Sequence, residues 1–115
     1  MKLISSQFSV NYPTGFNRNI GKPHRTRPAI LSRLNKKLNK LRPDRENTPL
    51  EFDQYDRLIV WTRFGNFYYR MSIRRSSSYR SWGVNVTDAE IDHVVIDLLR
   101  IINAVDKQDK SFLMN

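Results

Sequence analysis

The stretch from Arg57 to Arg75, RLIVWTRFGNFYYRMSIRR, constrains the fold more than any other part of the chain. Two runs rich in β-branched and aromatic residues flank Gly65 and Asn66. Glycine adopts a positive φ without penalty and asparagine adopts it better than most residues, as the tight turn of a two-residue hairpin requires. The stretch therefore predicts a β-hairpin that turns at Gly65-Asn66.

A turn at these two residues determines the register of the hairpin, because side chains alternate between the two faces of a strand. One face is then apolar and pairs Phe64 with Phe67, Thr62 with Tyr69, Val60 with Met71, and Leu58 with Ile73. The other face carries the pairs Arg63 with Tyr68, Trp61 with Arg70, Ile59 with Ser72, and Arg57 with Arg74.

The second face interleaves arginines with aromatic rings, and no acidic residue occurs in the hairpin. Such a face favours a polyanion whose rings can stack, which is typical of nucleic acid and above all of RNA or single strands. We therefore predict a nucleic-acid-binding surface made of Arg57, Trp61, Arg63, Tyr68, Arg70 and Arg74.

The positive charge of the chain is unevenly distributed. The 115 residues carry a net charge of +9, from 20 Lys and Arg against 11 Asp and Glu. Residues 1–43 hold ten basic residues and residues 57–86 hold six, with no acid in either block. Residues 44–56 hold one basic and five acidic residues, and residues 87–115 hold three and six. Two acid-free blocks favour a polyanionic partner, although a basic surface can also serve solubility alone.

Residues 28–41 predict an amphipathic helix. Pro28 suits the first turn, with Thr26 or Arg27 at the cap, and Pro43 stops the helix. An apolar stripe recurs at helical spacing and predicts a buried side, made of Ile30, Leu31, Leu34, Leu38 and Leu41. A second sector holds Arg33, Lys36, Lys37 and Lys40 without any Glu, and we predict that these four residues also bind phosphates. A plain solvated lysine-rich face is the alternative.

A second helix is predicted from Thr87 to about Val105. The sequence Thr87-Asp88-Ala89-Glu90 is a capping box, in which Thr87 accepts from the first turn and Glu90 reaches back to the cap. The broad apolar face marks the main core helix and comprises Ile91, Val94, Val95, Leu98, Ile101, Ile102 and Val105.

The remaining segments are shorter and less regular. We predict a strand within residues 3–12, a basic loop or arm at 13–27, an acidic connector at 43–56 that neutralises a neighbouring basic surface, and a flexible tail at 107–115. Trp82, Val84 and Val86 alternate with Gly83 and Asn85, which predicts a third strand beside the hairpin.

These elements predict one α+β domain spanning residues 1–115, in the order β-α-β-β-β-α. The strands form an antiparallel sheet and both helices pack on its apolar face, which leaves the arginine face for binding.

Several chemistries find no support in the sequence. The chain has no Cys, which excludes disulfides and thiolate ligands for zinc. Its two histidines, His24 and His93, fall in the arm and behind the core helix, and no glycine-rich phosphate loop is present. We therefore predict no catalytic residues, no metal and no cofactor. No apolar run approaches the roughly 20 residues that span a bilayer, so we expect a cytoplasmic protein without membrane contact.

In length, basicity and its Tyr/Arg-rich hairpin, the chain resembles the bacterial messenger-cleaving toxins of toxin–antitoxin pairs. That resemblance covers only the hairpin and implies a metal-independent ribonuclease. In element order the chain also resembles ribosome-hibernation factors and, without its first strand, double-stranded-RNA-binding domains. Those domains usually begin the last helix with a Lys-rich phosphate clamp, whereas this helix begins with the acidic Thr87-Asp88-Ala89-Glu90, which counts against a duplex-RNA domain.

Three classes of function remain open. The first is a non-catalytic nucleic-acid-binding protein, RNA or ribosome associated, that uses the hairpin face and the basic helix. The second is a small regulatory or inhibitory protein that binds an acidic partner protein, because exposed Trp, Tyr and Arg also form protein hot spots. The third is the ribonuclease. The sequence favours the first class and leaves the oligomeric state open.

Overall fold

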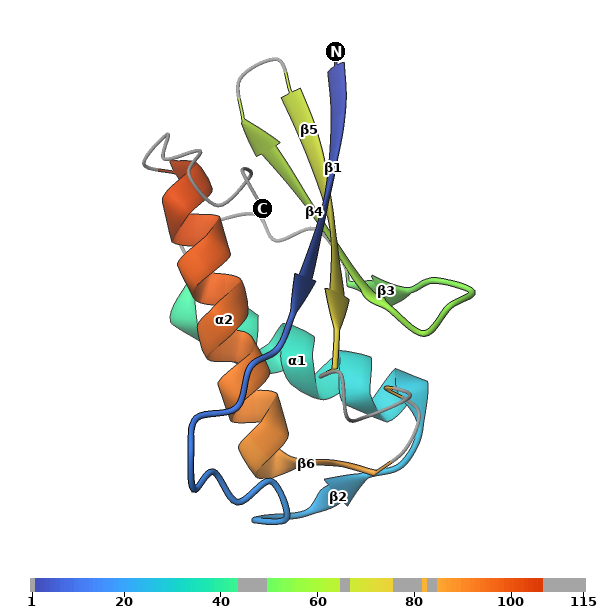
Figure 1. Ribbon diagram of the computed structural model, residues 1–115, viewed down its shortest axis with the longest axis vertical. Helices are drawn as coiled ribbons and strands as arrows, with labels where there is room; N and C mark the ends of the chain where they lie inside the picture. The colour runs from blue at the N-terminus through green and yellow to red at the C-terminus, as the bar shows by residue number, and fades with distance from the viewer. Residues whose placement is uncertain (1, 44–49, 65–66, 76–81, 83–84, 107–115) are drawn as a thin grey trace.

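The computed structural model of the chain (Figure 1) describes residues 2–43, 50–64, 67–75, 82 and 85–106, with only the backbone at 2–6, 62–64, 67–69 and 105–106. The elements in chain order are β1 (Lys2–Ser9), β2 (Pro23–His24), α1 (Arg27–Leu41), β3 (Glu51–Phe52), β4 (Leu58–Phe64), β5 (Phe67–Arg74), β6 (Val86–Thr87) and α2 (Asp88–Asp106). Helices and strands combine in one α+β fold, as predicted.

The hairpin has the predicted register. Strands β4 and β5 pair antiparallel from Leu58 opposite Ile73 to Phe64 opposite Phe67. The predicted turn residues, Gly65 and Asn66, lie outside the described part of the chain. The observed strand pairing confirms the predicted register, because each intermediate pair falls where the alternation of side chains places it.

Strand β1 adds a parallel edge to the hairpin, where an antiparallel sheet was predicted. It pairs with β5 from Lys2 opposite Phe67 to Ser9 opposite Arg74, and the sheet order is β1-β5-β4-β3. A parallel pair needs a crossover connection, and here α1, β3 and β4 intervene between the two strands. The alternation of apolar residues predicts which face a strand presents but not the direction in which it runs.

The prediction of a third strand beside the hairpin is wrong. Val86 and Thr87 form β6, which pairs antiparallel with β2 in a separate two-stranded sheet. Gly83 and Val84 lie outside the described residues. Trp82 is buried in the core, and its Nε1 donates to the carbonyl of Ile73 at 3.0 Å, which ties Trp82 to β5.

Both helices share one core with the apolar face of the hairpin. Strands β4 and β5 contribute four buried side chains, Leu58, Val60, Met71 and Ile73. The apolar stripes of both helices join them, through Ile30 and Leu34 from α1 and Ile91, Val94, Val95, Leu98 and Ile101 from α2. In Figure 1, α1 crosses α2 below the sheet. The opposite face is less open than predicted, since Ile59 and Ser72 at its centre are buried as well.

Helix α1 begins and ends where its sequence signals lie. Thr26 is the N-cap, and its hydroxyl accepts from the amide of Ala29 at 3.3 Å. Pro28 stands in the first turn, where a missing N–H costs nothing. The helix ends at Leu41, and the amide of Arg42 donates to the carbonyl of Leu38 at 2.9 Å.

The loop before α1 wraps the first turn of α2. The amides of Asp88 and Ala89 donate to the carbonyls of Lys22 at 3.2 Å and Ile20 at 3.1 Å. Gly21 lies between them with a φ of 92°, and a Cβ there would come within 2.6 Å of the Asp88 Cβ. The close approach therefore depends on a glycine at this position.

Glu90 does not reach back to the helix cap, which corrects the capping-box prediction. Thr87 does cap α2, because its hydroxyl accepts from the Glu90 amide at 3.4 Å. The Glu90 carboxylate instead accepts from Arg75 Nε at 2.9 Å and Nη2 at 2.7 Å, and from the Tyr12 hydroxyl at 2.7 Å. The side chains of Arg75 and Glu90 are 6% and 1% exposed, so they form a buried ion pair.

Burial and the hydrogen bond to Glu90 both raise the pKa of the Tyr12 hydroxyl above its ordinary value. Tyr12 is therefore a protonated donor at neutral pH. The three side chains link the segment after β1, the end of β5 and the first turn of α2.

Glu90→Gln leaves the Arg75 guanidinium buried without its counter-charge, and we expect a loss of about 3–5 kcal/mol in the free energy of unfolding. Asp92→Asn removes an exposed carboxylate that pairs with Lys37, and we expect a loss below about 1 kcal/mol. Urea unfolding followed by circular dichroism measures both. Equal losses in the two variants would contradict the anchoring role of the buried pair.

Candidate functional site

The predicted arginine face of the hairpin meets acids from β3 and the turn after it. Trp61 Nε1 donates to Glu51 Oε1 at 3.3 Å. Asp53 Oδ2 lies 3.7 Å from Arg57 Nε and 3.8 Å from Arg70 Nη2. Asp53 therefore partly neutralises the neighbouring basic surface, in line with the prediction for this stretch.

Local backbone geometry holds the Asp53 carboxylate in this place. Its Oδ1 accepts from the amides of Tyr55 at 2.9 Å and Arg57 at 2.8 Å, and its own amide donates to the Arg57 carbonyl at 3.0 Å. An aspartate that closes a turn in this way has little rotamer freedom. Its second oxygen is left for the arginines, so the neutralisation is built into the fold.

The other predicted hairpin residues do not restore a cationic face. Arg74 is exposed and has no ion-pair partner within the described part of the chain. It borders a small hollow of about 130 Å³ with Gln7, Phe8 and Ser9. Arg63 and Tyr68 are paired in the backbone register, and their side chains lie outside the description.

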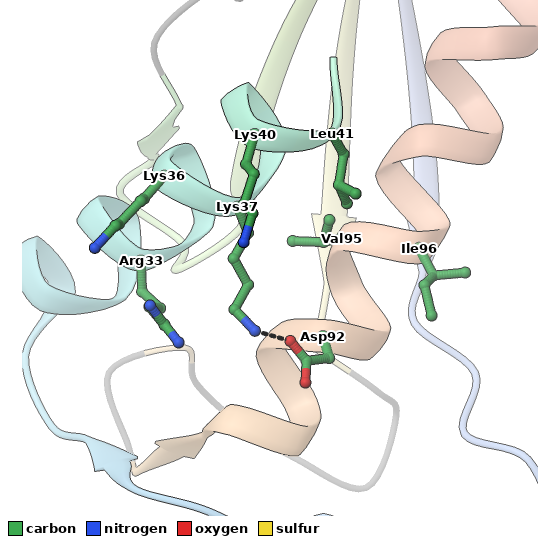
Figure 2. A pocket seen from close by; sticks show the side chains of 8 residues that line it. All are labelled: Arg33, Lys36, Lys37, Lys40, Leu41, Asp92, Val95 and Ile96. Carbon is green, nitrogen blue, oxygen red and sulfur yellow. Dashed lines mark hydrogen bonds and ion pairs between the residues drawn. The ribbon is translucent and has the colours of Figure 1, made fainter. Parts of the chain in front are cut away.

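The four predicted α1 cations come together on one wall of a groove between α1 and α2 (Figure 2). The groove has a volume of about 490 Å³. Its lining consists of Arg33, Lys36, Lys37, Lys40 and Leu41 from α1, and Asp92, Val95 and Ile96 from α2. Residues three and four apart lie on one side of a helix, which is why the cations share a wall.

Helix α2 places an acidic side chain near two of the four cations. Lys37 forms an ion pair with Asp92, drawn as a dashed line in Figure 2. Arg33 Nε lies 3.9 Å from Asp88 Oδ1, which is too long for a hydrogen bond. Lys36 and Lys40 are exposed, and among the described residues neither has an ion-pair partner. Four cations against Asp92 leave the lining with a net charge of +3.

Asp88 belongs to the scaffold below the groove. Its Oδ1 lies 2.7 Å from His24 Nε2, which donates because an ionised carboxylate can only accept, and its Oδ2 accepts from the Lys22 amide at 3.0 Å. These two hydrogen bonds hold the pKa of the Asp88 carboxyl below its usual value, and the bond from His24 has the larger effect. The ionised carboxylate ties β2 to the start of α2.

The α2 side of the groove and Leu41 were not predicted as functional. Leu41 was placed in the buried stripe of its helix, but it is 55% exposed. Ile96 lies outside the predicted apolar face of α2 and is 62% exposed. An isoleucine away from the core stripe is a signal that the sequence does contain, because such a side chain has no partner within its own domain.

The described residues hold no group of three His, Asp or Glu side chains placed to bind a metal ion. His93 Nε2 lies 2.7 Å from the carbonyl of Asn11, and its ring lies 5.1 Å from that of Phe16. Both histidines therefore hold the loop before α1 against α2. No helix in the described residues has the length and apolar character to cross a membrane.

Comparisons with protein-family models, with curated proteins and with solved structures gave no match to this chain.

Asp53→Asn keeps the oxygen that closes the turn and removes the charge beside Arg57 and Arg70. We expect this variant to elute from immobilised heparin at a higher salt concentration than Asp97→Asn. The second variant removes the same charge beside His93 on α2. The pair of variants separates a local effect on the hairpin from the change in net charge, and equal elution would show that Asp53 does not screen the hairpin arginines.

Proposed function

We propose that this protein is a non-catalytic nucleic-acid-binding protein that holds single-stranded RNA along the cationic face of α1. The observation that carries the proposal is the pair Lys36 and Lys40, two exposed ammonium groups without an acid partner in the described residues. A lysine that neutralises a phosphate displaces cations condensed on the nucleic acid, and the release of those cations favours binding.

The spacing of the cations supports contact with successive phosphates. Arg33 and Lys40 are seven residues apart, which corresponds to about 10 Å along a helix axis at 1.5 Å per residue. Phosphates of one strand rise by about 3.4 Å per nucleotide in a stacked helix. The row therefore spans about three nucleotide steps.

The shape of the site supports a single strand over a duplex. A protein that reads duplex DNA places a protruding helix in the major groove, which is about 12 Å wide. The cations of α1 line a groove against α2 instead, so the neighbouring helix occupies the space that a duplex would need. A single strand is narrow enough to lie along this wall.

The engagement of both histidines supports a binding role without catalysis. His24 is bound to Asp88, and His93 is bound to a backbone carbonyl and packed on aromatic rings. A ribonuclease that uses histidine as its acid–base group needs an imidazole beside the bound phosphate. The residues that line the groove include neither histidine.

Replacement of both Lys36 and Lys40 by Gln removes the two unpaired cations. We expect the affinity for a labelled single-stranded RNA to fall about tenfold or more near 0.1 M salt, because two phosphate contacts are lost. The slope of log K against log salt should become shallower by about 1.4, at roughly 0.7 per contact for a single strand. Fluorescence anisotropy at several salt concentrations measures both quantities.

The matched control replaces Arg74 and Arg100 by Gln. Both are exposed, neither has an ion-pair partner in the described residues, and neither lines the groove. This variant loses the same net charge and should keep most of its affinity. An equal loss in the control would mean that only overall charge drives binding, and undetectable binding by the unaltered protein at low salt would refute the proposed function.

A further inference from the structure

The groove between α1 and α2 has an apolar part that phosphate binding does not use. Leu41, Val95 and Ile96 line it, with Leu41 at the end of α1 and the other two residues on α2 (Figure 2). Leu41 and Ile96 are 55% and 62% exposed, and they are two of the four large exposed hydrophobic side chains among the described residues. Exposed apolar side chains gathered in one groove mark an interaction surface more often than isolated ones do.

The cationic part and the apolar part of the groove lie side by side. Lys37 and Lys40 extend from the same helix that ends in Leu41, and Asp92 and Ile96 lie one turn apart on α2. A ligand that fills the groove therefore contacts apolar side chains and, beside them, the cationic wall of α1, within a lining whose net charge is +3. The complement of this surface has an apolar stripe with acidic groups along its edge.

We propose that the groove is a docking site for an acidic amphipathic helix of a partner protein. Leucine-like residues at i, i+3, i+4 and i+7 of the partner pack against the exposed side chains of Leu41 and Ile96, with the buried Val95 at the base of the groove. Its flanking Asp or Glu side chains pair with Lys36 and Lys40, which lack acid partners in the described residues. The partner helix adds a third helix to the α1–α2 pair.

Nucleic acid does not account for this half of the groove. Aliphatic side chains offer no ring for a base to stack on, and a phosphate beside Ile96 would lose water without gaining a donor. A second copy of this chain does not fit either, because two copies of a groove with a net charge of +3 repel each other. An amphipathic acidic helix satisfies both the apolar and the cationic residues.

The docking site and the proposed RNA site share the lysines of α1 but differ in their other residues. The helix needs Leu41 and Ile96, whereas RNA needs only the cationic wall. We therefore expect the two ligands to compete. The partner helix then acts as a regulator that releases bound RNA, although its own binding does not depend on the RNA proposal.

The test uses a labelled synthetic peptide of about four helical turns, with Leu at i, i+3, i+4 and i+7 and Glu at most other positions. A scrambled peptide of the same composition is its control. We expect the patterned peptide to bind the full chain at least tenfold more tightly than the scrambled one. It should also keep more of its affinity than RNA does when salt is raised, since apolar contacts are not screened.

Ile96→Gln should weaken binding of the patterned peptide about tenfold and leave the affinity for RNA unchanged. Ile20→Gln is the matched control, since Ile20 is 60% exposed and lies outside the groove lining. Equal binding of the two peptides, or an unchanged affinity in Ile96→Gln, overturns the docking site. A loss of RNA affinity in Ile96→Gln without peptide binding assigns the apolar wall to nucleic acid and also overturns it. A parallel measurement of RNA binding by the unaltered protein tests the proposed function separately.

Discussion

The buried ion pair between Arg75 and Glu90 joins the end of β5 to the first turn of α2, and the arrangement of the sheet and the helices depends on this contact. Arg75 follows the end of β5, Glu90 lies in the first turn of α2, and Tyr12 joins the pair from the segment after β1. An isolated charge in this place would be costly, so each of the three groups holds the others. Because α2 starts here, its apolar face covers the hairpin and its opposite edge stands beside α1. The groove is therefore a consequence of the same contact that joins the sheet to the helices.

The distribution of acids separates the two basic surfaces of the molecule. On the hairpin, Asp53 is held by its own turn and faces Arg57 and Arg70, so the charge of these arginines is partly neutralised within the fold. On α1, the acids of α2 reach only part of the row, and Lys36 and Lys40 have no ion-pair partner among the described residues. Sequence blocks with the same acid-free composition thus have different surfaces, because a strand or helix from elsewhere in the chain supplies the counter-charge.

The sequence predicted the parts of this fold that local rules determine. Alternation of side chains gave the hairpin register, and helical periodicity gave both helices within a residue or two of their ends. The parallel direction of β1, the pairing of β6 with β2 and the use of Glu90 in the core depend on contacts between distant segments, which no local pattern contains. For the site, the cations of α1 were visible in the sequence. The apolar half was missed because Ile96 lies outside the predicted apolar face of α2 and Leu41 was assigned to the core.

We propose that ligands bind between the two helices and not on the hairpin face. Chemical-shift mapping of the isotopically labelled protein during titration with single-stranded RNA tests this claim most directly. We expect the largest chemical-shift changes of backbone amides at residues 33–41, and smaller changes at residues 92–96 across the groove. The amide signals of Arg57, Trp61 and Arg70 should keep nearly the chemical shifts of the free protein. If the largest changes occurred at those three residues and the signals of α1 did not change, the proposal would be contradicted and the binding site would lie on the hairpin.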